Sequence, residues 1–75
     1  MARYDFEVIE GGEAIESVRS IELQNPKALW SRIAELAKKV YVPGRTIRVT
    51  NHLGEMIILI GVATAIRYVS SLGGQ

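Results

Sequence analysis

Residues 44–60 read GRTIRVTNHLGEMIILI, and this stretch decides what kind of fold the chain can adopt. Its first part alternates apolar Ile47 and Val49 with polar residues, which is typical of a half-buried strand. A turn at residues 51–54 follows, and its last residue is a glycine that can take the left-handed conformation of a short hairpin loop. Residues 55–60 then hold apolar side chains on both faces, so we expect a strand that needs cover on each side.

An amphipathic helix is predicted upstream of this hairpin, from residue 26 to about residue 40. Asn25 is a good N-cap, and Pro26 suits the first helical position because its missing N–H is no loss there. Pro43 and Gly44 close the far end. Apolar residues recur between them with helical spacing and polar residues fill the opposite side, so we expect one face of this helix to pack on a sheet.

The chain begins with a segment that alternates like a strand, from residue 3 to residue 9. We expect one side to carry Tyr4, Phe6 and Val8 and the other to carry Asp5, Glu7 and Ile9. Gly11 and Gly12 allow a tight turn, after which residues 14–18, or more, return as a second strand.

The segment after residue 61 can be read in two ways. Its apolar residues fit a helical stripe, although Val, Thr, Ile and Tyr are also good strand residues. We favour a short helix. The chain is then one small α+β domain over residues 1–75, of order ββαββ, with an antiparallel sheet, one main amphipathic helix on one face and a short C-terminal helix.

Self-association is expected because 75 residues bury only a small core. The chain has no cysteine, which removes disulfides and the commonest zinc sites as sources of stability. We therefore predict a homodimer that uses the fourth strand and the C-terminal helix. The predicted interface residues are Ile58, Ile60, Val62, Ile66, Val69 and Leu72.

Charge is distributed unevenly along the chain. Residues 1–25 carry six acidic and two basic residues, a balance of −4, whereas residues 26–75 carry seven basic and two acidic residues, a balance of +5. We expect acidic strands to pair with basic ones across the sheet. The alternative is pairing of opposite charges between subunits.

No residue pattern indicates catalysis, a cofactor or a metal ion. His52 is the only histidine and falls in the hairpin turn, away from any predicted carboxylate or nucleophile partner. The phosphate-binding, metalloprotease and serine-hydrolase motifs do not occur. The longest apolar run, residues 56–66, is too short for a membrane span of about 20 residues, and the acidic N-terminus is unlike a signal peptide. We therefore expect a cytoplasmic protein without enzymatic activity.

A protein-interaction or regulatory module is the function that these features favour. Trp30 and Tyr41 flank the apolar stripe of the main helix, where they either close the rim of the core or anchor a partner. The alternative is weak nucleic-acid binding through basic side chains on the helix and third strand, namely Lys38, Lys39, Arg45 and Arg48.

The segments RYDFEV, IELQNPKAL, AELA and GRTIRVTNHLGE together resemble a small bacterial family of domains of unknown function. The shared features are an N-terminal R-Y-x-F strand and a C-terminal G-x-x-I-x-V-T-x-x-x-G-E hairpin, and the similarity runs from Arg3 to about Ile60. The chain departs from the family pattern at SVRS, before the helix, and at Asn51 and His52 in the hairpin. The resemblance implies the fold and a bacterial cytoplasmic setting, but no activity.

Overall fold

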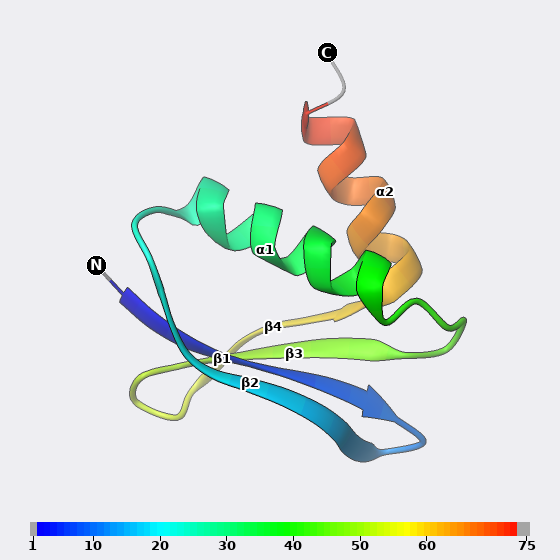
Figure 1. The fold of residues 1–75 in the computed structure, drawn as a ribbon, viewed down its shortest axis with the longest axis horizontal. Coiled ribbons are helices and arrows are strands. Elements are labelled where there is room, and N and C mark those ends of the chain that lie inside the picture. Colours follow the sequence, from blue (N-terminus) through cyan, green and yellow to red (C-terminus); the bar gives the residue numbers. More distant parts are fainter. Residues whose placement is uncertain (1, 74–75) are drawn as a thin grey trace.

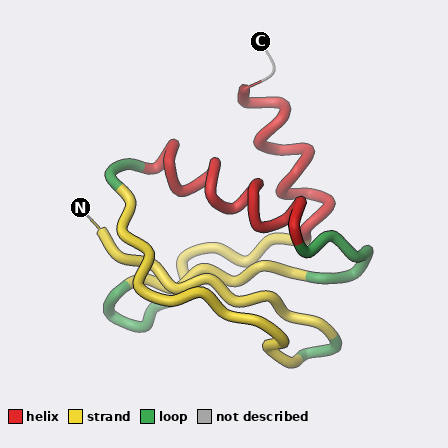
Figure 2. The backbone as a smooth tube through the Cα atoms, in the orientation of Figure 1, coloured by secondary structure: helices red, strands yellow, loops and turns green. Residues whose placement is uncertain are grey.

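The computed structural model describes residues 2–73, and it describes side-chain burial for residues 2–68. Its elements are β1 (Ala2–Glu10), β2 (Glu13–Leu23), α1 (Pro26–Lys39), β3 (Thr46–Asn51), β4 (Met56–Gly61) and α2 (Val62–Gly73). This order confirms the predicted ββαββ arrangement followed by a C-terminal helix. The strands form one layer, and both helices lie on the same side of it (Figures 1 and 2).

The sheet is antiparallel throughout, with strand order β2-β1-β3-β4. The first strand of the sequence therefore lies inside the sheet, while β2 and β4 form its two edges. Phe6 and Val8 of β1 face the helices and are buried, as their alternation predicted. Within residues 2–73, the remaining face of the sheet carries no helix (Figure 1).

The hydrophobic core lies between the sheet and the two helices. It is formed by Phe6, Val8, Leu29, Ile33, Ala37, Val40, Ile47, Val49, Val62 and Ala65. Val62 was predicted to contact a second subunit, but it is only 1% exposed and belongs to this core. The physical reason is that α2 begins directly after β4. Val62, its first residue, therefore points inward against α1.

Both helices follow from local sequence signals. The Asn25 side chain accepts a hydrogen bond from the Ala28 N–H at 2.8 Å, and Pro26 opens α1, as predicted. The helix ends where the Val40 N–H donates to the Leu36 carbonyl. The C-terminal segment is helical over Val62–Gly73, so the alternative strand interpretation is wrong.

The β2 strand contains two irregularities that explain its weak sequence pattern. Its pairing with β1 shifts register between Tyr4 and Phe6 and again between Val8 and Ile9. Ser20 lies at the first shift with φ 58°, a left-handed conformation that is unusual for serine. Its N–H donates to the Asp5 carboxylate at 2.8 Å, which holds the bulge in place. Two bulges break the strict alternation that marks an undistorted strand.

We expect the substitution Ile47→Val to lower the free energy of unfolding by about 1 kcal/mol, because it removes a methylene from a fully buried site. Ile15→Val is the matched control, since Ile15 is 47% exposed on β2. Urea unfolding followed by circular dichroism measures both. Equal losses in the two variants would contradict the position of the core.

Candidate functional site

The outer surface of β4 is apolar and uncovered. Ile58 and Ile60 pack against the core, whereas Met56, Ile57 and Leu59 are 57%, 43% and 57% exposed. We call these three exposed residues the β4 patch. The sequence predicted that this strand would be apolar on both faces, and within the described chain the helices cover only one of them.

The two edges of the sheet differ in how well they are protected against pairing with another strand. The β2 edge carries Glu13, Glu16, Arg19 and Glu22 together with its two bulges. Charges and bulges are the usual features that keep an edge strand from adding a neighbour. The β4 edge reads MIILIG and contains neither charge nor proline, and its single register shift lies near its start, beside Thr50. Of the two edges, the β4 edge is therefore the less protected against pairing with another strand.

Ion pairs cross the sheet between β1 and the basic residues at β3. The Arg48 Nε atom lies 2.8 Å from a Glu7 carboxylate oxygen, and Arg45 Nε lies 2.6 Å from a Glu10 carboxylate oxygen. Glu7 and Arg48 also face each other in the strand register. The predicted pairing of acidic and basic strands is thus confirmed within one chain.

These ion pairs involve two of the four basic residues that were predicted to bind nucleic acid. Arg45 and Arg48 already bind carboxylates, whereas Lys38 and Lys39 are exposed at the end of α1. Arg48 alternates with the buried Ile47 and so points to the sheet face opposite α1. The structure therefore does not gather the four cations on one surface.

Trp30 joins the two helices. Its ring packs edge-on against Tyr68 of α2, with ring centroids 4.8 Å apart and an interplanar angle of 62°. Tyr41 is half exposed, and it lines a shallow hollow of about 290 Å³ together with Ala63, Ile66 and Arg67. Of the predicted interface residues, Ile66 lies in this hollow.

The side chains of Val69 and Leu72 were also predicted at the dimer interface. They lie outside the residues whose side chains the structure describes.

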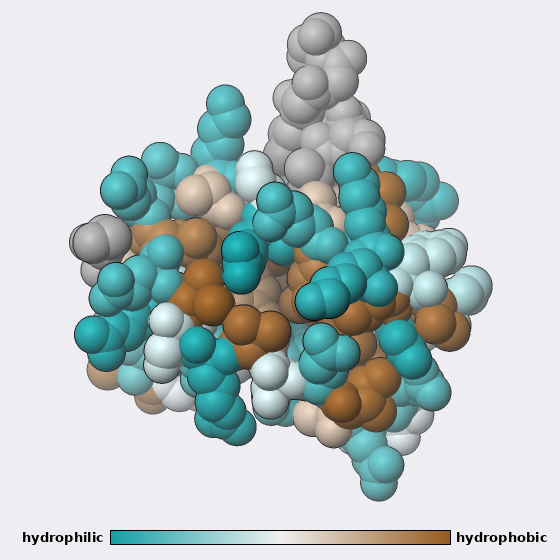
Figure 3. Space-filling view, viewed as in Figure 1, coloured by the Kyte–Doolittle hydropathy of each residue, from teal (hydrophilic) through white to brown (hydrophobic). Residues whose placement is uncertain are grey.

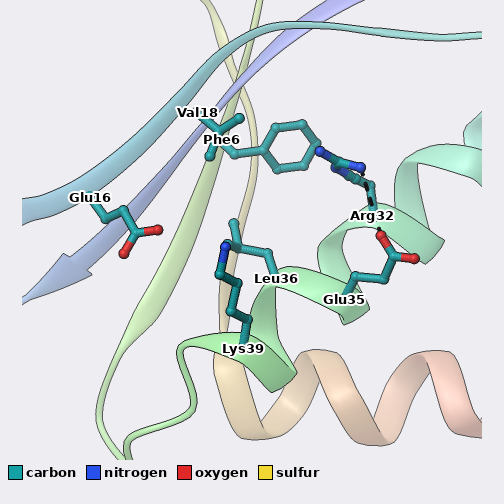
Figure 4. A pocket seen from close by; sticks show the side chains of 7 residues that line it. All are labelled: Phe6, Glu16, Val18, Arg32, Glu35, Leu36 and Lys39. Atoms are coloured by element: carbon teal, nitrogen blue, oxygen red, sulfur yellow. Dashed lines mark ion pairs between the residues drawn. The ribbon is translucent and has the colours of Figure 1, made fainter.

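A groove of about 250 Å³ lies between α1 and β2. Figure 4 shows the side chains that line it: Phe6, Glu16, Val18, Arg32, Glu35, Leu36 and Lys39. Sequence reasoning missed this groove. Glu16 pairs opposite the buried Val8 and therefore faces the helix layer, where a carboxylate is unusual, but the sequence alone does not show this pairing because it follows a register shift.

A polar hollow at the other end of the sheet contains the only histidine. It is lined by Arg3, Asp5, Ser20, Asn51, His52 and Gly54. The Asp5 carboxylate accepts the Ser20 backbone N–H, and among the described residues no hydrogen bond joins His52 to Asp5 or to the Ser20 hydroxyl. A serine nucleophile needs a base within hydrogen-bond reach, and the described hydrogen bonds place none beside the Ser20 hydroxyl.

Within the described part of the chain, no group of three or more His, Cys, Asp or Glu side chains is placed to hold a metal ion. No helix in residues 2–73 is long and apolar enough to cross a membrane. Comparison of the chain with protein-family models, curated proteins and solved structures finds no match. The resemblance to a bacterial family of domains of unknown function therefore stays a prediction.

We expect a double-mutant cycle on Glu7 and Arg48, with each replaced by Gln, to give a coupling energy of about 1 kcal/mol. Their side chains are only 21% and 40% exposed, which reduces screening by water. The Arg3–Glu22 pair, at 64% and 49%, is the control and should give less than about 0.5 kcal/mol. Urea unfolding measures all variants, and equal coupling in both pairs would contradict the assignment of Glu7–Arg48 as the stronger contact.

Proposed function

We propose that the protein is a small, non-enzymatic protein-interaction module that acts as a homodimer joined through its β4 edges. The exposed apolar β4 patch on an unprotected edge strand is the observation that carries this proposal. A free edge of this kind offers a row of unpaired backbone groups to another strand. The cytoplasmic setting expected from the sequence remains part of the proposal.

The neutrality of β4 favours a second copy of the chain as the occupant. A two-fold axis places each surface against itself, so any charge near the axis meets an identical charge. The β4 strand carries no charge, and its basic neighbour Arg48 is already paired with Glu7. Self-pairing therefore meets no like-charge repulsion at its centre.

An antiparallel register centred on Leu59 fits the alternation of β4. In this register Ile58 of one copy opposes Ile60 of the other on the helix side, which would continue the two cores across the axis. Leu59 opposes its own copy on the open face. Cross-strand apolar pairs of this kind each stabilise a sheet by a few tenths of a kcal/mol. The two four-stranded sheets would become one continuous sheet.

Nucleic-acid binding is the alternative function. Lys38 and Lys39 are available for phosphate contacts, but Arg45 and Arg48 would first have to release Glu10 and Glu7. The loss of two of the four predicted cations halves the counterion release on which such binding depends. The geometry therefore supports the protein-interaction module better.

We expect the protein to elute in size-exclusion chromatography with light scattering at twice 8.3 kDa at micromolar concentration. The variant Leu59→Lys should be monomeric, because two lysines would meet at the axis. Ile15→Lys is the control: it adds the same charge at an exposed apolar residue of the other edge and should stay dimeric. Circular dichroism shows whether each variant is folded.

A wild-type mass of 8.3 kDa would overturn the homodimer. Dissociation by Ile15→Lys, with Leu59→Lys remaining dimeric, would place the contact on the β2 edge instead.

A further inference from the structure

The groove between α1 and β2 is independent of the proposed dimer, because β2 and β4 are opposite edges of the sheet. Its floor is apolar and consists of Phe6 from β1, Val18 from β2 and Leu36 from α1. Figure 3 shows apolar atoms exposed between hydrophilic side chains on the face that carries α1 and β2. The groove therefore exposes the half-buried Val18 and Leu36 at the margin of the core, while Phe6 is only 1% exposed.

The β2 wall of the groove is acidic, whereas the α1 wall carries two basic residues and the acidic Glu35. Glu16 projects from β2, while Arg32 and Lys39 project from α1 and lie two helical turns apart (Figure 4). Arg32 is near Glu35, at 3.8 Å, in an exposed pair of the weakest kind. Among the described residues, neither Glu16 nor Lys39 takes part in an ion pair.

We propose that this groove binds a free apolar α-amino acid. The ligand ammonium would face the Glu16 carboxylate, its carboxylate would face the Lys39 ammonium, and its side chain would lie on Val18 and Leu36. The volume of about 250 Å³ is somewhat below the usual range of ligand pockets and accommodates a small ligand the size of leucine. Both charges of the ligand then have a partner, and its apolar part leaves water.

Other occupants fit this groove less well. A simple anion would meet the carboxylates of Glu16 and Glu35, and a simple cation would meet Lys39 and Arg32, so neither matches both walls. An extended peptide that adds to β2 would have to cross two bulges, at Ser20 and at Ile15, and between them only residues 16–18 pair regularly with β1. The interior of a peptide also lacks the free ammonium and carboxylate that the two walls would recognise.

The test is a titration of the full-length ¹⁵N-labelled protein with leucine, followed by amide chemical shifts. We expect shifts at Phe6, Val18 and Leu36 and a dissociation constant of the order of 1 mM, because the groove is open to solvent. N-acetyl-leucine lacks the ammonium and leucinamide lacks the carboxylate, and each should bind at least about fivefold more weakly.

Charge-removing variants test the two walls separately. Glu16→Gln and Lys39→Gln should each weaken leucine binding about fivefold. Lys38→Gln is the matched control, because Lys38 is the next residue on the same helix and does not line the groove. It should bind leucine like the wild type, and circular dichroism verifies that all three variants fold.

Two results would overturn the proposal. One is the absence of any shift at about 50 mM leucine, far above the expected dissociation constant. The other is equal binding of leucine and of N-acetyl-leucinamide, which would show that the groove recognises peptide-like or merely apolar ligands. Both results leave the homodimer unaffected, since Leu59 and the rest of the β4 patch lie at the opposite edge.

Discussion

The central constraint on this molecule is that one layer of helices covers only one face of a four-stranded sheet. Phe6 and Val8 of β1 and their neighbours on β3 are buried beneath α1, so the sheet is held together from one side. The other face must be compatible with water. On the inner strands this face carries the Glu7–Arg48 ion pair, whose two charges neutralise each other while both side chains keep contact with solvent.

The same constraint leaves two strand edges, and the chain treats them differently. The β2 edge carries charged residues and bulges, whereas the β4 edge carries uncharged apolar side chains. The groove lies beside this edge, between β2 and α1. One edge is thus suited to pairing with a strand, and the other is suited to holding a smaller group between its charged walls.

Much of this fold could be predicted from the sequence, because local signals specify it. The alternation around Phe6, the Asn25 cap and the glycines at the turns each act within a few residues, and each was confirmed. Strand order could not be obtained this way, since it depends on contacts between distant segments. Val62 was misplaced because an apolar stripe looks the same whether its own chain or a second one covers it. The groove was missed because it depends on bulges, which shift Glu16 to the helix side in a manner that no periodicity reveals.

Trp30 is the only tryptophan of the chain, and it sits at the contact between the two helices through its edge-on packing with Tyr68. Its indole fluorescence is therefore a built-in optical reporter of whether α2 is docked against α1. The molecule carries a spectroscopic probe of its own C-terminal helix, one that needs no dye and no added label.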